Sequence, residues 1–206
     1  LKASGIEAGR ISQIYPGIEY ERKQESGRVR ERGSSSFLYF GRLGISKGLD
    51  LLLPAFAQLH EQYPEVKLKL ITPSKPKKIY KWIKRYIRKH KIQDVVELKL
   101  SLPFEELQQE IKNADCVVIP SYSEGFCYTA VETMALGTPI VSSGQGALDE
   151  VIGGKFVQMK EQLVEGLVQA MEKAFTRNWG IKSSNEFLLK TSVNQHLKLY
   201  EIIVNE

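Results

Sequence analysis

The sequence predicts an α/β fold built on a doubly wound, mostly parallel sheet. Apolar strand candidates alternate with helical candidates along residues 37–141, and most of the strand candidates are nearly continuous apolar runs. Such runs are typical of parallel strands that helices cover on both faces. The strict alternation then implies right-handed βαβ units.

The individual elements follow one another at regular spacing. The predicted strands cover residues 37–40, 66–71, 95–100, 116–119 and 139–141. The predicted helices cover residues 47–63, 76–90, 104–113 and 126–136, followed by amphipathic helices at 161–175 and 184–204. The helices have apolar side chains every three or four residues, which places them on one helical face. In the second strand, Lys67 and Lys69 alternate with apolar residues, so we expect that strand to be partly exposed.

The N-terminal residues extend this pattern. Residues 11–15 form a predicted short strand that ends at Pro16-Gly17. Residues 24–36 are polar and rich in Gly and Ser, and they form a predicted mobile loop. We interpret residues 1–206 as one domain whose terminal helix pair packs on it or reaches elsewhere. The chain begins at Leu1 rather than Met, from which we expect an excised fragment.

The composition indicates a soluble globular protein, with 42% hydrophobic and 26% charged residues. No apolar run approaches the roughly 20 residues of a membrane span, and no signal peptide is visible. The two cysteines, Cys116 and Cys127, suggest no disulfide framework and favour a reducing cytoplasm. Cysteine and histidine are too sparse and scattered for a zinc site, so we expect no metal.

The chain carries a net charge of +5, which favours an anionic ligand or surface. Its basic residues gather at 75–91, a stretch that contains no acid. Three interpretations of this stretch remain open. It is the solvated face of a packed helix, a peripheral contact with an anionic membrane that carries a lipid-linked acceptor, or a nucleic-acid site. No base-stacking or groove-reading motif accompanies these basic residues, which disfavours the nucleic-acid interpretation.

A pair of glutamates follows the fourth predicted strand. Seven residues separate Glu124 from Glu132, and a turn at Gly125 leads into a helix expected to open at about Phe126. The first turn of a helix offers unpaired N–H groups and the positive end of the macrodipole, which together favour an anion. Glu132 lies about two turns inside the helix among apolar residues, where a carboxylate needs a polar partner. By itself, the segment also fits a helix with a terminal charge and a solvated Glu.

A glycine-rich segment joins the first core strand to its helix: Phe40-Gly41-Arg42-Leu43-Gly44-Ile45-Ser46-Lys47-Gly48. It lies at the carboxyl end of the strand, where open parallel sheets bind ligands. Its glycines allow a tight turn and a close approach of the backbone to a ligand. Arg42 and Lys47 place two cations on this rim, which suits a diphosphate. The segment matches neither a Walker A loop nor the G-x-G-x-x-G fingerprint, and by itself it also fits a surface turn.

The two segments form a more specific pattern together. Gly-Arg-Leu, three residues and Lys-Gly are followed about 80 residues later by Pro-Ser-x-Ser-Glu-Gly-Phe, a second Glu and Gly-Thr-Pro-Ile-Val. This pattern resembles the C-terminal domain of group 1 (family four) retaining glycosyltransferases. The resemblance extends from about Ile11 to the C-terminus and includes Tyr15-Pro16-Gly17-Ile18-Glu19. That family has the GT-B architecture, in which the second of two Rossmann-like domains binds most of the sugar nucleotide.

The resemblance implies a role for each residue of the pattern. Arg42 and Lys47 would hold the donor diphosphate, Glu132 would accept hydrogen bonds from the ribose hydroxyls, and Glu124 would lie beside the transferred sugar. The implied catalytic residues are Glu124, Arg42 and Lys47. The residues implied to bind the substrate are Gly41, Arg42, Lys47, Glu124, Gly125, Phe126, Cys127 and Glu132.

The implied chemistry agrees with these residue types. Transfer leaves a nucleoside diphosphate, so negative charge builds on the β-phosphate in the transition state. Fixed cations and the amides around Phe126 and Cys127 would stabilise that charge, and no metal or other cofactor is then required. Cys127 stands where the family usually has Gly. The loop Thr72-Pro73-Ser74-Lys75 replaces a glycine-containing loop near the nucleobase, which leaves UDP and GDP both open.

We therefore interpret the chain as the nucleotide-sugar-binding domain of a retaining glycosyltransferase, cytoplasmic or peripheral to the inner face of the membrane. It would transfer a hexose from an NDP-sugar to a glycan or lipid-linked acceptor, and the acceptor would bind through an N-terminal domain that this sequence lacks. Two alternatives remain. One is a GT-B sugar-nucleotide epimerase, and the other is a catalytically silent module that binds anions or nucleotides.

Overall fold

The computed structural model describes residues 5, 10–19 and 36–205. The chain divides into two compact units. The larger unit spans Arg22–Asn185, and the smaller one joins Leu1–Glu21 to Glu186–Glu206. The predicted mobile loop at 24–36 lies outside the described residues, apart from Ser36, which opens the first strand.

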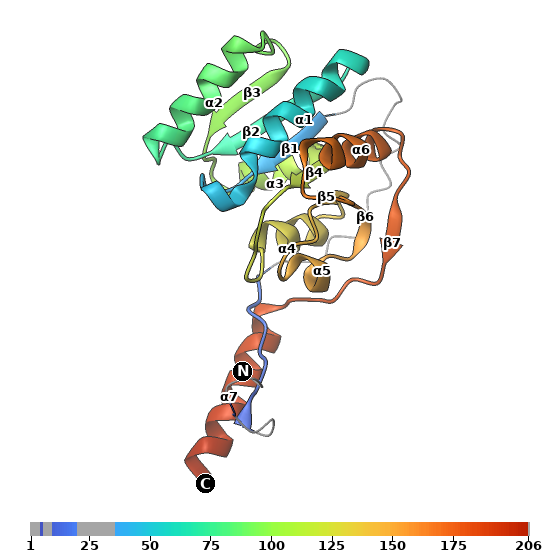
Figure 1. The fold of residues 1–206 in the computed structure, drawn as a ribbon. Coiled ribbons are helices and arrows are strands. Elements are labelled where there is room, and N and C mark those ends of the chain that lie inside the picture. The colour runs from blue at the N-terminus through green and yellow to red at the C-terminus, as the bar shows by residue number, and fades with distance from the viewer. Residues whose placement is uncertain (1–4, 6–9, 20–35, 206) are drawn as a thin grey trace. The chain divides into compact units, whose positions relative to one another are not determined.

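The larger unit contains a seven-stranded sheet in the order β3-β2-β1-β4-β5-β6-β7 (Figure 1). The six strands from β1 to β6 are parallel, and β7 runs antiparallel to β6. The strands are β1 Ser36–Phe40, β2 Lys67–Thr72, β3 Val96–Leu100, β4 Cys116–Ile119, β5 Ile140–Ser142, β6 Gly154–Gln158 and β7 Gly180–Lys182. This order confirms the predicted α/β, doubly wound sheet.

Helices follow the strands and cover both faces of the sheet (Figure 1). They are α1 Leu49–Gln62, α2 Lys77–Lys89, α3 Phe104–Asn113, α4 Tyr128–Ala135, α5 Leu148–Val151 and α6 Val164–Phe175, with a short 3-10 helix, η3, at Ile45–Lys47. Buried residues of α1, α2 and α6 share one core with Phe37 and Tyr39 of β1. Leu38 and Phe40 alternate with them and are buried on the other face. Strands buried on both faces explain the continuous apolar runs of the sequence.

Every strand predicted between residues 37 and 141 is confirmed to within one residue at each end. The prediction that β2 is partly exposed is also confirmed, because Lys67 is exposed and Lys69 is half-buried. Three short elements, α5, β6 and β7, were not predicted. α5 and β7 span only four and three residues, and all three residues of β7 are exposed. β6 has five residues, but only Phe156 and Val157 form an apolar run there.

Two helix starts differ from the predictions for a backbone reason. The first helix was expected from residue 47, but Gly48 has a φ of 66°, so α1 begins at Leu49. The helix that was expected to open at about Phe126 begins at Tyr128, because Cys127 has a φ of 73° and lies in the left-handed region. The site-bearing helix therefore starts two residues later than the sequence pattern indicates.

The smaller unit corrects two predictions. The strand predicted at residues 11–15 is not formed. Ile18 instead makes a single bridge with Leu188 and donates its N–H to the Phe187 carbonyl at 2.8 Å. Because the chain is engaged there, the last helix, α7, begins at Leu189 rather than at residue 184 and ends at Asn205. No helix among the described residues is both long and apolar enough to cross a membrane.

Candidate functional site

The candidate site lies at the middle of the sheet, where the chain reverses the direction in which it adds strands. β1 pairs with β2 on one side and with β4 on the other. The loops that leave the carboxyl ends of β1 and β4 therefore lie side by side. In open α/β sheets this switch point is the usual ligand crevice. Both segments that the sequence singled out are at this position.

Gly48 holds the two loops against each other. Its backbone lies so close to the Pro120 carbonyl that an added Cβ would collide with it, and its φ of 66° is unfavourable for other residues. The Tyr122 N–H donates to the Ser46 carbonyl at 2.8 Å, which closes the same contact. Gly41 also has a positive φ, 142°, and its missing side chain would face Thr129 of α4. Gly44, in contrast, is extended at −167°, so the predicted need for glycine does not apply there.

Lys47 and Glu124 form an ion pair across the two loops. The Lys47 Nζ lies 2.7 Å from Glu124 Oε1, and the side chains are 23% and 10% exposed. Ser121 Oγ donates to the same Oε1 at 2.7 Å. Both bonds fall on one carboxylate oxygen, and no partner to Oε2 is found among the described residues. The Glu124 carboxylate is thus fixed in place while one of its oxygens stays available.

Cys127 is the buried N-cap residue of α4. Burial raises the pKa of its thiol to about 12, and the negative charge of Glu124 adds to this. Glu132 also raises the pKa, whereas Lys47 lowers it. Lys47, Glu124 and Glu132 thus all act on the thiol at the N-cap of α4, although their sequence positions span 47 to 132. The pKa of Tyr39 is raised as well, first by burial and then by Glu124 and Cys127.

Glu132 is half-buried in the second turn of α4. Burial raises the pKa of its carboxyl group. No hydrogen bond or ion pair joins its carboxylate to another residue that the structure describes. A half-buried carboxylate without a partner is unfavourable unless a ligand supplies one.

The N-terminus of α4 presents amides to the same region. Its first intrahelical bond runs from the Ala130 N–H to the Cys127 carbonyl at 3.0 Å. The N–H groups of Tyr128 and Thr129 come before it and have no acceptor among the described residues. Gly125 is exposed, with open space where a Cβ would be. The ring of Phe126 is half-buried and meets Tyr128 edge-on at 5.3 Å.

Arg42 is the one predicted cation that the structure leaves apart. Its side chain is exposed and has no hydrogen bond or ion pair with any described residue, while its carbonyl accepts a hydrogen bond from the Tyr39 hydroxyl at 3.2 Å. The structure therefore brings Lys47, Glu124, Glu132 and Cys127 together and shows Arg42 on the exposed loop beside them.

Two residues of the site, Ser121 and Ser143, were not predicted from the sequence. Ser121 is buried and contacts Glu124, and Ser143 Oγ donates to the Ser121 carbonyl at 2.6 Å. The Ala147 N–H also donates to the Glu124 carbonyl at 2.9 Å, so the loop after β5 supports the site from a third side. Ser121 belongs to the Pro-Ser-x-Ser-Glu motif, and its position three residues before Glu124 was the available signal.

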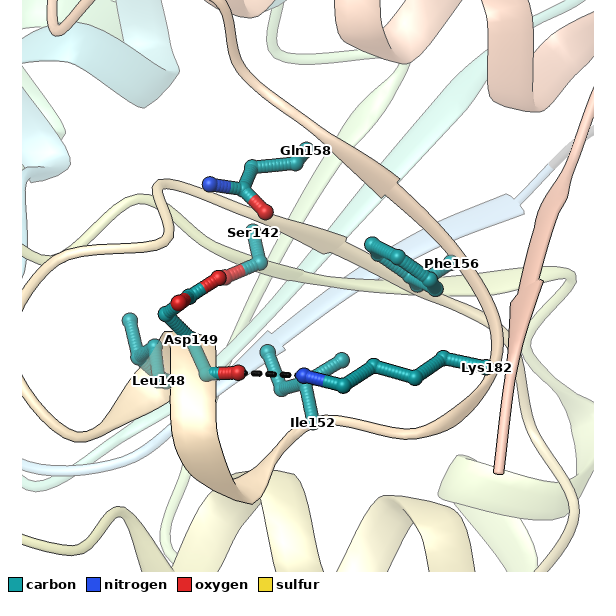
Figure 2. A pocket seen from close by; sticks show the side chains of 7 residues that line it. All are labelled: Ser142, Leu148, Asp149, Ile152, Phe156, Gln158 and Lys182. Carbon is teal, nitrogen blue, oxygen red and sulfur yellow. Dashed lines mark hydrogen bonds between the residues drawn. The ribbon is translucent and has the colours of Figure 1, made fainter. Parts of the chain in front are cut away.

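A separate cavity of about 90 Å³ lies beside the end of β5, between α5, β6 and β7. Figure 2 shows Lys182 reaching across it, where Nζ donates to the Asp149 carbonyl at 2.5 Å. Ser142 and Gln158 line it on the strand side. None of the predicted site residues lines this cavity. No cluster of three or more His, Cys, Asp or Glu side chains arranged for a metal occurs among the described residues.

Comparison with known proteins decides the family. The family model of glycosyl transferases group 1 matches residues 21–187. The chain belongs to the family of glycosyl transferases group 1. It is 32% identical over 165 residues to D-inositol 3-phosphate glycosyltransferase 2 of Catenulispora acidiphila, which covers 72% of this chain and 38% of that protein. The resemblance stated from the sequence motifs is thus confirmed.

Solved structures agree with the observed fold. The catalytic domain of starch synthase IV from Arabidopsis thaliana, bound to ADP and acarbose, has a TM-score of 0.69 and 20% identity over 87% of this chain. The pneumococcal O-GlcNAc transferase in complex with UDP and GlcNAc has a TM-score of 0.65 and 18% identity over 85%. These likenesses support the Rossmann-like, GT-B type of fold. The chain spans about two-fifths of the length of these relatives.

Proposed function

We propose that this chain is the nucleotide-sugar-binding part of a retaining glycosyltransferase, which transfers a hexose from an NDP-sugar to a glycan or lipid-linked acceptor. The observation that carries the proposal is the clustering of Lys47, Glu124 and Glu132 at the N-terminus of α4, at the switch point of the sheet. This cluster offers a cation, free amides and two carboxylates, which are the groups that a diphosphate, a sugar and a ribose would need.

The donor diphosphate would bind between Lys47 and the start of α4. The free N–H groups of Tyr128 and Thr129 and the helix dipole favour an anion there. Arg42, exposed on the neighbouring loop, would close over the phosphates from the other side. Charge that develops on the β-phosphate as the sugar leaves would be stabilised by these groups more than the ground state is. The proposal needs no metal for this step.

Glu124 would orient the transferred sugar. Its Oε1 is held by Lys47 and Ser121, so Oε2 would accept hydrogen bonds from sugar hydroxyls. When a diphosphate binds, it would compete with Glu124 for the Lys47 ammonium. Donor binding would then free part of the Glu124 carboxylate for the sugar, which couples the two recognition steps.

Glu132 would accept two hydrogen bonds from the ribose diol. Its raised pKa, and the lack of a partner for it among the described residues, fit a carboxylate whose partners arrive with the ligand. The base is left open between UDP and GDP. ADP and UDP in the two similar structures support a nucleoside diphosphate of some kind.

The acceptor would bind to parts of the protein beyond this chain, because the chain spans about two-fifths of its relatives. We therefore expect the isolated chain to bind nucleotides but not to transfer sugar at enzymatic rates. A cytoplasmic location is part of the proposal, since both cysteines are buried and unpaired.

Isothermal titration with UDP, GDP and ADP, and with inorganic pyrophosphate and a nucleic-acid polyanion as comparisons, tests the proposal. Selective binding of one nucleoside diphosphate at micromolar affinity would support it. Indifferent binding of every polyanion would contradict it and would favour an anion-binding module. Release of a free epimerised sugar nucleotide by the whole protein would favour an epimerase instead.

A further inference from the structure

The basic segment from Lys75 to Lys91 is unusual because its charges form no ion pair within the described part of the chain. It holds nine of the 29 Lys and Arg residues and none of the 24 acids, so the rest of the chain has more acids than bases. All nine side chains are exposed, and none has an ion-pair partner among the described residues. Cations of the neighbouring strands behave differently, since Lys69 and Lys99 both pair with Glu110. The segment therefore keeps a concentrated positive charge available to an external partner.

The opposite side of α2 attaches it firmly to the fold. Ile83 and Ile87 are buried in the core, and Ile79, Tyr80 and Tyr86 pack against it. α2 lies at one end of the sheet, over the edge strands β2 and β3 (Figure 1). The cations face outward from this end and are not needed for packing. This separation of a buried apolar stripe from a cationic face makes the face a preformed surface.

Aromatic side chains border the cationic face. At 3.6 residues per turn, Trp82 lies at one edge of it and Tyr80 at the other, while Tyr86 and His90 continue from Trp82 toward the buried side. The rings of Trp82 and Tyr86 are 5.6 Å apart, and those of Tyr86 and His90 stack at 4.0 Å. Lys84 lies 5.7 Å from the centre of the Tyr80 ring. Partly exposed Trp and Tyr beside Lys and Arg is the composition that favours the headgroup layer of a bilayer.

We propose that this face of α2 docks on an anionic lipid bilayer. A single convex helix of 13 residues matches a flat surface of distributed charge rather than a groove. None of the aromatic rings lies within the cationic arc itself, so a stacking platform for nucleic-acid bases is absent from this part of the structure. The inference goes beyond the proposed function, because it involves none of the residues of the candidate site. Docking would hold the chain at a surface where a lipid-linked acceptor is found.

Vesicle sedimentation tests this directly, with phosphatidylcholine vesicles and with vesicles that also contain phosphatidylserine. The wild-type chain should bind only the anionic vesicles, and the binding should fall steeply with salt, because the Debye length is only about 10 Å at 0.1 M. The variant Lys81→Gln/Lys84→Gln/Arg88→Gln should lose on the order of 100-fold in affinity. The matched control Lys67→Gln/Lys155→Gln/Lys173→Gln removes the same charge from exposed positions elsewhere. This control should keep most of the affinity for anionic vesicles.

Both variants should keep the wild-type circular dichroism spectrum and the wild-type affinity for a nucleoside diphosphate. A failure of the membrane-docking proposal can therefore be distinguished from a failure of the proposed nucleotide site. Three results would overturn the proposal. They are no wild-type binding to anionic vesicles, equal loss in the two triple variants, and tighter binding to a single-stranded oligonucleotide than to the vesicles.

Discussion

Lys47 and Glu124 are 77 residues apart in sequence and form an ion pair of 2.7 Å between the loops that follow β1 and β4. Ser121 supports the pair by donating to the same carboxylate oxygen. In the proposed function, Lys47 serves the diphosphate and Glu124 serves the sugar. Their contact before a ligand binds means that the two subsites are linked, and that donor binding must exchange one partner of Lys47 for another.

The contact of Gly48 with Pro120 should be essential for bringing the loops together. Gly48→Ala would add a Cβ that collides with the Pro120 carbonyl and would strain a left-handed residue. We expect a loss of about 2–4 kcal/mol in the free energy of unfolding, measured with urea. Gly44→Ala is the control, since Gly44 is extended and its nearest neighbour would be 3.6 Å away, and it should change stability by under about 0.5 kcal/mol. Equal losses in the two variants would disprove the role of Gly48.

Ser121 should position Glu124 without touching the diphosphate. Ser121→Ala removes one donor from Oε1 and leaves the Lys47 contact in place. The preference for an NDP-sugar over the matching NDP should fall about fivefold, which corresponds to about 1 kcal/mol for one hydrogen bond. Titration of both ligands measures this. If affinity for the plain NDP fell as much as that for the NDP-sugar, Ser121 would be a general structural residue of the loop.

Glu132 should recognise the ribose. Glu132→Gln keeps the shape but replaces one acceptor by an amide donor, so one hydroxyl of the diol is poorly matched. Nucleotide affinity should fall by about 1.5–3 kcal/mol, the range for a hydrogen bond to a charged group. An otherwise identical ligand without the ribose hydroxyls should lose much less. Glu124→Gln is the comparison variant and should leave nucleoside diphosphate affinity unchanged. If Glu132→Gln weakened the affinities for the ribose and dideoxyribose ligands equally, the assignment of Glu132 to the ribose would be wrong.

Glu110 should make stability depend on pH. Burial acts to raise the pKa of its carboxyl, but hydrogen bonds from Lys69 at 2.5 Å and Lys99 at 2.7 Å outweigh it, so the pKa lies below its usual value of 4.5. A depressed folded-state pKa adds stability that is present above the unfolded pKa and is lost as pH falls through the folded one. Wild type should exceed Glu110→Gln by about 1 kcal/mol at pH 7. Urea unfolding at a series of pH values should show this difference shrinking below pH 4.5, and a constant difference would rule the explanation out.

The sequence was sufficient for the five strands from β1 to β5, because these strands consist mostly of apolar residues. Runs such as β4, Cys116–Ile119, can be recognised by their apolar residues alone. β7 could not be recognised, because Gly180–Lys182 is exposed and pairs only at the edge. Helix starts depended on single backbone angles, such as the positive φ of Cys127, which residue type does not reveal at a non-glycine position.

The candidate site could be predicted in part for a similar reason. A doubly wound topology places the loops after β1 and β4 together, so the nearness of Lys47 to the start of α4 follows from strand order. The direct bond between Lys47 and Glu124 does not follow, because it depends on how far each side chain reaches. Ser121 was overlooked since a serine in a turn has no evident role until its neighbour is known.

The central claim is that the cations beside α4 bind a diphosphate. Titration of wild type, Arg42→Ala and Lys47→Ala with a nucleoside diphosphate and with the nucleoside alone tests it most directly, with Lys155→Ala as a surface control. We predict that Lys47→Ala weakens diphosphate binding by roughly 10-fold or more, that Arg42→Ala also weakens it, and that nucleoside binding stays within about twofold of wild type. Equal loss of affinity for both ligands would contradict the account, because these residues would then act on the fold and not on the phosphates.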